Sequence, residues 1–149
     1  MTDAKKNTKT GTPSAPRTAS AGAKPETKAE HKGLLALIRI RGAPKMSTQM
    51  VDTLDCLNLK SRNSCVIVPD TSSYRGMIRK VNSFITWGEI SDETARALET
   101  KRLGPKKHVF RLHVPTKGLE RKGIKLPYKV GGVLGYRGKD INELIMRMI

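Results

Sequence analysis

The residues of this chain best able to do chemistry are cations, and they gather in one late block. Residues 101–139 hold twelve lysines and arginines and a single acid, Glu120. Lysine and arginine neutralise phosphates, and interleaved tyrosines such as Tyr128 and Tyr136 can stack on unpaired bases. So many like charges repel one another in the absence of an anionic partner. The block therefore predicts a nucleic-acid interface, with a solvated loop as the alternative.

The most glycine-dense stretch, Gly131–Gly138, lies inside this block. Glycines let backbone N–H groups approach phosphates closely, and a helix start follows at Asp140. A dinucleotide fingerprint needs a strand immediately before the glycines, which Leu126–Lys129 supplies poorly, and no Gly-Lys-Ser/Thr follows to make a P-loop. We therefore favour a loop that lies against RNA phosphates, flanked by Arg137 and Lys139, over the nucleotide site of an enzyme.

No other group of side chains has the spacing of a catalytic or metal site. The three histidines and two cysteines lack metal-ligand spacing, the acids form no evident acid–base pair, and no Gly-x-Ser-x-Gly motif occurs. We expect His113 at the surface or against a phosphate, and Cys65 in the core. The sequence therefore predicts no enzyme, no metal and no other cofactor.

Composition restricts the class of protein further. The chain has 149 residues, with 29 lysines and arginines against 13 acids, and a net charge of +16. Such an excess predicts a polyanionic partner, for which RNA, DNA and an anionic membrane all qualify. The apolar run Leu34–Ile38 is too short to span a bilayer, and the N-terminus lacks the apolar part of a signal peptide. We therefore expect a soluble, intracellular protein.

The elements that must position the cations alternate between strand and helix. The clearest strand is the β-branched run Val66–Val68, which Pro69 ends because it lacks a backbone N–H. A helix capped by Asp70 or Thr71 is predicted from there to about Ser83. Further strands are predicted at 34–41, 85–89 and 109–114, and further helices at 47–58, 91–103 and 140–149. This alternation is typical of a domain with a sheet layer and a helix layer.

Two segments lie outside the alternation. Residues 1–33 contain no Val, Ile, Leu, Phe, Tyr or Trp, so they cannot bury enough apolar surface to offset their ordering entropy. We expect them to form a disordered basic tail before a single domain at 34–149. Within that domain, residues from about 114 to 139 show no helix or strand period. They are predicted to form an extended segment before the terminal helix.

Several short motifs occur in one order along the chain after residue 33. They are Leu37–Gly42, Asp52–Leu54, Val68–Met77, Trp87–Glu89, Phe110–His113, Gly131–Gly138 and Ile141–Met148. In these motifs the chain closely resembles the L-thirty ribosomal protein family of the large subunit, in its archaeal form, with related eukaryotic counterparts. The resemblance covers nearly all of the chain after the tail.

The resemblance implies a structural constituent of the large ribosomal subunit in the cytoplasm. It would bind large-subunit rRNA, near the 5S rRNA region and beside neighbouring ribosomal proteins, and stabilise the rRNA fold in translation. No membrane, small-molecule substrate, cofactor or catalytic residue is implied. The implied fold is α+β: a small ferredoxin-like sheet with helices on one face, a β-α-β-α-β core, an extended basic C-terminal segment and a terminal helix.

The chain departs from the family pattern in three places. The first is the basic tail before Gly33, which the archaeal pattern does not cover, although eukaryotic relatives also have basic N-terminal extensions. Long-form relatives carry several tens of residues before the Phe110–His113 motif, whereas Leu98–Val109 bridges that gap directly here. Where relatives read Pro-Pro-Arg-Gly-Gly, this chain has Val114–Gly118. Its Lys117 cannot reproduce the planar, bidentate phosphate grip of arginine.

We therefore predict an RNA-binding surface whose cations neutralise phosphates and whose tyrosines stack on splayed bases. Its members are Arg39, Arg41, Tyr74, Arg75, Arg79, Lys80, His113, Lys117, Arg121, Lys122, Lys125, Tyr128, Lys129, Tyr136, Arg137 and Lys139. Tyr74 has core packing as its alternative role. For the whole protein, the alternative is a free-standing basic protein that binds DNA or RNA as an architectural factor.

Overall fold

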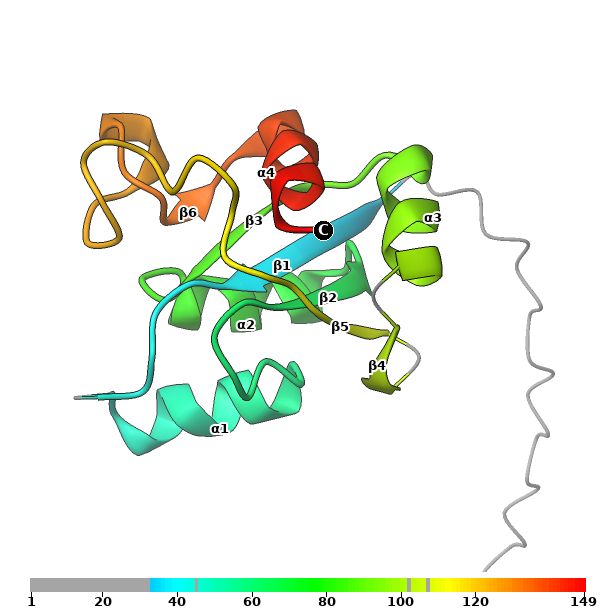
Figure 1. Ribbon diagram of the computed structural model, residues 1–149. Helices are drawn as coiled ribbons and strands as arrows, with labels where there is room; N and C mark the ends of the chain where they lie inside the picture. Colours follow the sequence, from blue (N-terminus) through cyan, green and yellow to red (C-terminus); the bar gives the residue numbers. More distant parts are fainter. Residues whose placement is uncertain (1–32, 45, 102, 107) are drawn as a thin grey trace, which may run out of the picture.

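A six-stranded sheet runs through the described part of the chain (Figure 1). The computed structural model describes residues 33–44, 46–101, 103–106 and 108–149, so the predicted tail, except Gly33, lies outside the described residues. Across the sheet the strands are β4 (Leu103–Lys106), β5 (Val109–Arg111), β2 (Ser64–Pro69), β1 (Leu34–Arg39), β3 (Ile85–Glu89) and β6 (Gly135–Tyr136). Neighbouring strands are antiparallel, except β3 and β6, which run parallel.

Helices cover both faces of this sheet. Helices α1 (Thr48–Cys56) and α2 (Ser72–Val81) lie below it in Figure 1, and α3 (Asp92–Lys101) and α4 (Ile141–Met148) lie above it. The alternation of β1 explains the two layers, because successive side chains of a strand point to opposite faces. Leu35 and Leu37 pack in a core cluster with α1 and α2, whereas Ala36 and Ile38 pack in a second cluster with α3 and α4.

The predicted α+β class with a ferredoxin-like sheet is confirmed. The two helices of the β-α-β-α-β core, α1 and α2, share one face of the sheet as predicted, while α3 and α4 cover the other face. Side chains on both faces of β1 are buried, and a sheet with two apolar faces needs a covering layer on each face. The expected core position of Cys65 is confirmed as well, since its side chain is fully buried and burial raises the pKa of its thiol to about 12.

Element ends differ from the prediction by a few residues in most places and by a whole strand in one. The predicted helix at 91–103 ends at Lys101, and the chain then forms β4, which pairs with β5. At the start of α2, the Thr71 hydroxyl accepts a hydrogen bond from the Tyr74 backbone N–H at 3.4 Å, so Thr71 is the cap. Before α4, Asp140 makes no side-chain cap, because its carboxylate accepts from the Tyr128 hydroxyl instead.

The extended basic segment is not confirmed, because this part of the chain folds back on the domain. It contains a 3₁₀ helix, η1 (Tyr128–Val130), the short strand β6 beside β3, and a second 3₁₀ helix, η2 (Gly138–Asp140). Val133 and Leu134 are buried in the cluster that also holds α4. We name residues 114–139 the C-terminal segment.

Replacement of glycine with alanine is expected to change the free energy of unfolding in opposite directions at two positions. A Cβ at Gly88 would lie 2.1 Å from the Gly138 carbonyl oxygen, whereas a Cβ at Gly76, within α2, would meet nothing within 4 Å. We expect Gly88→Ala to lower the free energy of unfolding by about 1–3 kcal/mol or more, because β3 and η2 must separate. Gly76→Ala should raise it by about 0.5–1 kcal/mol through helix propensity. Urea denaturation measures both, and a fully stable Gly88→Ala variant would contradict the close approach.

Candidate nucleic-acid interface

Four of the predicted RNA-binding residues meet at one groove. Arg79 from α2 lines it together with Tyr128, Lys129 and Tyr136 from the C-terminal segment. The groove has a volume of about 350 Å³. These residues are far apart in the sequence, and they come together because β6 pairs with β3 next to α2. The groove is therefore a product of the folded C-terminal segment.

Aromatic rings and aliphatic side chains line the interior of the groove. The rings of Trp87 and Tyr136 have centroids 4.7 Å apart and planes tilted by 50°. Ile78 and Leu134, both buried, add aliphatic surface. Trp87 was not among the predicted residues, although the only tryptophan of the chain, next to a glycine in a strand, was a signal that could have indicated it.

The polar atoms of these rings already have partners within the domain. The Trp87 indole N–H donates to the Asn82 side-chain oxygen at 3.1 Å, and the Tyr136 hydroxyl donates to Glu89 at 2.8 Å. The hydrogen bond to Glu89 raises the pKa of Tyr136. The Tyr128 hydroxyl likewise donates to Asp140 at 2.7 Å, which raises the pKa of Tyr128. The rings are thus held in place, and Tyr136 remains 42% exposed.

Arg137 was predicted to contact phosphate, and the structure corrects this. Its side chain is only 2% exposed, pairs with the Glu120 carboxylate, and donates to the Val133 carbonyl at 3.4 Å. Its guanidinium carbon also lies 4.3 Å from the centroid of the Tyr128 ring, a cation–π contact. Arg137 therefore holds the C-terminal segment together from inside.

Glu120, the single acid of the late block, is shared by two arginines. Besides Arg137, the Arg147 guanidinium lies 3.7 Å from the same carboxylate oxygen. Burial alone would raise the pKa of Glu120, but the hydrogen bond and the charge of Arg137, with the charge of Arg147, outweigh it, so the pKa is lowered. The acid inside the basic block is thus neutralised by internal cations and does not offset the exposed ones.

Arg39 was also predicted to contact phosphate, and it too is an internal side chain. It is 5% exposed, and its guanidinium donates to the carbonyls of Leu59 at 2.7 Å and Lys60 at 2.6 Å. A third bond, at 3.0 Å, reaches the carbonyl of Arg41. Burial lowers the pKa of Arg39, an effect that nearby Asp55 partly opposes. Arg39 lies on the same face of β1 as Leu35 and Leu37, because every second residue of a strand shares a face. This alternation in the sequence could have indicated that Arg39 is buried.

Two other predicted arginines are exposed or half-buried but have partners. The Nε and Nη2 atoms of Arg75 donate to the two oxygens of the Asp70 carboxylate at 2.5 Å each, and this pairing lowers the pKa of Asp70. The Arg41 guanidinium lies 4.9 Å from the centroid of Phe84 and donates to the Ser83 carbonyl at 3.2 Å. Both remain candidates for a shared phosphate contact, because exposed pairs of this kind are weak.

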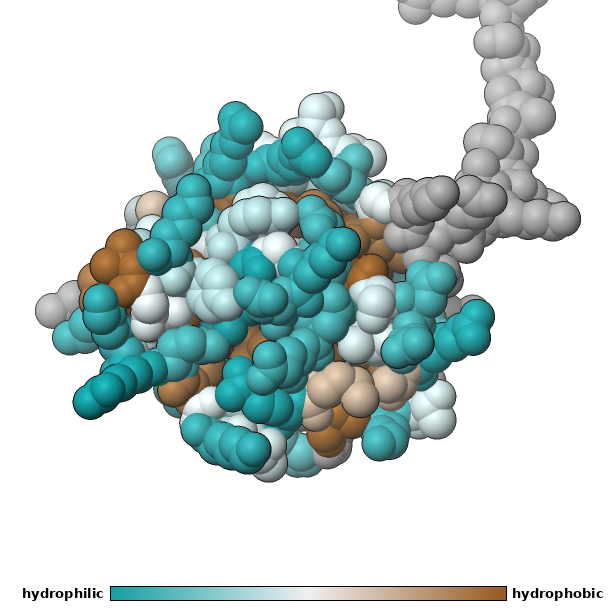
Figure 2. Space-filling view, turned by 90° about the horizontal axis from the view of Figure 1, so that it is seen from above, coloured by the Kyte–Doolittle hydropathy of each residue, from teal (hydrophilic) through white to brown (hydrophobic). Residues whose placement is uncertain are grey.

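The remaining predicted lysines and arginines, together with His113, lie at the surface. Most belong to the C-terminal segment, which carries exposed apolar side chains among them at Ile124, Leu126 and Val130. Figure 2 shows hydrophilic side chains over most of the face seen from above, with small hydrophobic patches between them. The exposed members are Arg79, Lys80, His113, Lys117, Arg121, Lys122, Lys125, Lys129 and Lys139.

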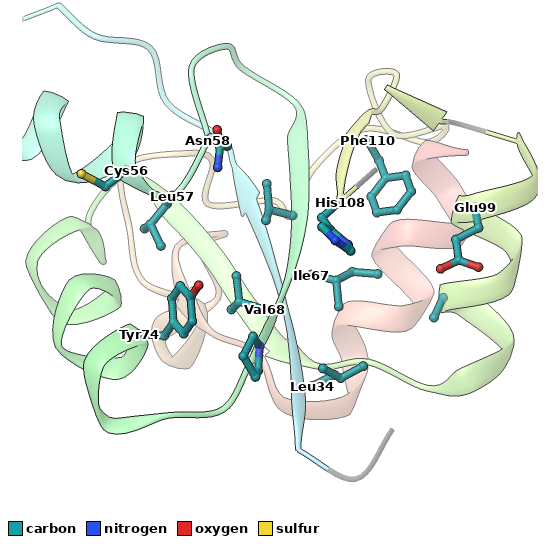
Figure 3. Close-up of a pocket in the computed structure, with 13 residues that line it drawn as sticks. Leu34, Cys56, Leu57, Asn58, Ile67, Val68, Tyr74, Glu99, His108 and Phe110 are labelled. Atoms are coloured by element: carbon teal, nitrogen blue, oxygen red, sulfur yellow. The ribbon is translucent and has the colours of Figure 1, made fainter. Parts of the chain in front are cut away.

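A second cleft, of about 480 Å³, has different chemistry (Figure 3). Its lining is mostly apolar, with Leu57, Val68 and Phe110 among the side chains, and its one carboxylate belongs to Glu99. Of the predicted residues only Tyr74 lies there, half-buried against the cluster of α1 and α2. The carboxylate repels phosphate, and apolar walls cannot replace the hydration that a phosphate would lose, so this cleft is not part of the candidate interface.

Potential metal ligands do not cluster within the described ranges. No group of three or more His, Cys, Asp or Glu side chains that could hold a metal ion occurs among these residues. Within the same ranges, no helix is both long and apolar enough to cross a membrane.

The fold and this surface define a basic α+β domain with exposed cations, two of which, Arg79 and Lys129, line a groove with aromatic rings. Such an arrangement is typical of RNA-binding proteins. Residues 35–85 match the family model described as "Ribosomal protein L30p/L7e". The chain is 36% identical to "Large ribosomal subunit protein uL30" of Methanococcus maripaludis, in a match covering 76% of this chain and 98% of that protein. The same-named proteins of Methanopyrus kandleri (36% identity; 74% and 100% covered) and Nanoarchaeum equitans (35%; 78% and 99%) are similar to it as well. The chain belongs to the uL30 family of ribosomal proteins.

The comparison also shows a segment that the relatives have and this chain lacks. The match to the Methanococcus maripaludis protein runs over 151 positions but takes in 76% of 149 residues, about 113, so about 38 positions have no counterpart here. The sequence resemblance places this difference between α3 and β5. There the described chain has only the four-residue strand β4.

Proposed function

We propose that this protein is a structural constituent of the large ribosomal subunit that binds large-subunit rRNA and stabilises its fold. Its family and the printed names of its relatives support the assignment to the large subunit. One observation carries the RNA-binding part: the C-terminal segment exposes its lysines, while its only acid is neutralised from inside by Arg137 and Arg147.

This surface is suited to phosphates more than to base sequence. Flexible exposed lysines act as point charges that neutralise phosphates, and such contacts set affinity and make it depend strongly on salt. The proposed phosphate contacts are the exposed cations of α2 and of the C-terminal segment, Lys139 included. Arg39 and Arg137 are left out of this set because both are buried.

The proposal extends to partners and location. We infer contacts with neighbouring ribosomal proteins and a position near the 5S rRNA region, within cytoplasmic ribosomes. No catalytic step is part of the proposal, since the uL30 family is structural.

Sedimentation of the native protein with large subunits at low salt tests the proposed assignment to the large ribosomal subunit. Protein that sediments apart from large subunits, or that follows DNA and not RNA, would instead support a free-standing architectural factor.

Charge removal from the C-terminal segment should lower both affinity and salt dependence. Replacing Arg121, Lys122 and Lys125 together with alanine removes three exposed cations. We expect the slope of log K against log salt for deproteinised large-subunit rRNA to become shallower by about 2 to 3, because each lost phosphate contact contributes about 0.7 to 0.9. Filter binding across a salt series measures this slope.

A triple alanine variant that removes three positive charges outside the C-terminal segment serves as a matched control. Lys60, Arg62 and Arg96 are also exposed, but they lie after α1 and on α3, away from the C-terminal segment. Their triple alanine variant should keep the parental slope apart from a small general effect. Equal slopes for the two triple variants would show that net charge alone drives binding.

A further inference from the structure

We propose that the groove between α2 and the C-terminal segment holds one unpaired RNA base, stacked on the rings of Tyr136 and Trp87. Arg79 and Lys129 would neutralise the phosphates on either side of that nucleotide. This inference rests on the proposed function and adds to it the state of the nucleotide that is recognised, a base outside any helix.

The interior of the groove selects a flat, apolar ligand face. Its walls are the tilted pair of Trp87 and Tyr136 and the aliphatic side chains of Ile78 and Leu134. A volume of about 350 Å³ lies at the lower end of small-molecule sites, which suits one nucleoside and no larger group. Bases stack on aromatic side chains because every base has a π-face.

The polar groups of the rings cannot select a polar ligand, because they already have partners. The Trp87 N–H is bound by Asn82, and the Tyr136 hydroxyl is bound by Glu89. What the groove offers is therefore ring surface more than donors and acceptors. Stacking of this kind tolerates any base sequence but requires an unpaired base, since bases in a duplex are covered by their neighbours.

Cations line the groove from the two elements that form it. Arg79 lies on α2 and Lys129 on η1, and both side chains are exposed. A base inserted between these elements carries a phosphate on each side, so the two charges complement the ligand. An uncharged aromatic ligand or a protein side chain would leave both cations unused.

Hydrogen bonds within the domain connect the strands that form the groove in the absence of a ligand. The Arg137 backbone N–H donates to the Trp87 carbonyl at 2.9 Å, and the Thr86 hydroxyl donates to the Gly135 carbonyl at 3.2 Å. Gly135 itself has a φ of +86°, which a residue with a side chain rarely adopts. Little ordering cost remains for binding, because the rings are already positioned.

Trp87, the only tryptophan, reports directly on the groove in the full-length protein. We expect a short single-stranded oligoadenylate to quench its fluorescence saturably, whereas an RNA duplex of equal length and inorganic polyphosphate bind without that quenching. Tyr136→Leu should weaken oligoadenylate binding by about fivefold to a hundredfold, the range for losing one stacked base. Tyr136→Phe, which keeps the ring, should bind almost as tightly as the parent, and circular dichroism shows whether each variant is folded.

The rim cations have a control on the same helix. Arg79→Ala and Lys129→Ala should each weaken oligoadenylate binding several-fold, and Lys80→Ala, an exposed cation of α2 outside the groove, should weaken it less. Salt-dependent rRNA binding with unchanged Trp87 fluorescence, or equal quenching by polyphosphate, would overturn this inference and leave the proposed function intact. Absence of any RNA binding would overturn both.

Discussion

Replacing Glu120 with glutamine is expected to lower the free energy of unfolding by about 3–5 kcal/mol, the cost of leaving a buried charge without its partner. The Arg137 side chain is 2% exposed and cannot reach water to compensate. Arg147 would lose a second, longer contact with the same carboxylate. Urea denaturation followed by circular dichroism measures the change.

The control for this variant is Glu143→Gln. Glu143 also faces Arg147, at 3.9 Å, but its side chain is 79% exposed. Loss of such an exposed helix pair costs no more than about 0.5 kcal/mol. Similar losses in the two variants would contradict the idea that burial of Arg137 gives the Glu120 contact its importance.

The same substitution removes a pH dependence of stability. The pKa of Glu120 is lowered in the folded protein from an ordinary value of 4.5, so the unfolded chain binds its proton more readily. The stability that Glu120 contributes is therefore fully present above about pH 4.5 and is lost as pH falls through the lower folded value. The difference in unfolding free energy between the parent and Glu120→Gln should shrink over that range. A difference that stays constant from neutral to acid pH would show that the carboxylate is not the stabilising form.

Arg39→Ala is expected to lower the free energy of unfolding by about 2–4 kcal/mol. Its guanidinium holds the carbonyls of Leu59 and Lys60, which follow α1, against the end of β1. Truncation leaves these carbonyls without a donor in a buried site, and each orphaned group costs about 1–3 kcal/mol. Thermal and urea denaturation measure the loss.

Arg41→Ala provides the comparison for that variant, since Arg41 is half-buried and makes one backbone hydrogen bond and one cation–π contact. Its expected cost is about 0.5–1 kcal/mol. Because Arg39 is internal, Arg39→Ala should also keep the parental salt slope for rRNA once corrected for the folded fraction. A shallower slope would restore Arg39 to the RNA-binding surface.

The sequence predicted the strands and helices better than it predicted the C-terminal segment. Hydrophobic periodicity locates β1, α2 and α4, because one period describes each element. The sequence of the C-terminal segment shows no hydrophobic periodicity, and its fold depends on contacts with elements that are distant in the sequence. Val133 and Leu134 pack with α4, and β6 pairs with β3, which lies about fifty residues earlier. Local patterns carry no information about such pairings.

The candidate interface shows the same division. Most of the cations predicted from the charge pattern are exposed, and four predicted residues share one groove. Arg39 and Arg137 were misassigned because charge alone does not distinguish a solvated arginine from a buried one. Trp87 was missed because its ring joins the groove only once β3 and β6 lie side by side.

The sequence by itself determined the basic character, the alternating strands and helices, and the family motifs, since composition and periodicity are properties of the chain. Only the tertiary structure decided which cations of the late block remain free to meet phosphate. Arg137 is buried with Glu120 as its ion-pair partner, whereas lysines close to Glu120 in the sequence are exposed to water. The physical reason is that burial of a charge depends on a partner brought close by folding, and local sequence patterns do not show which residue that partner is.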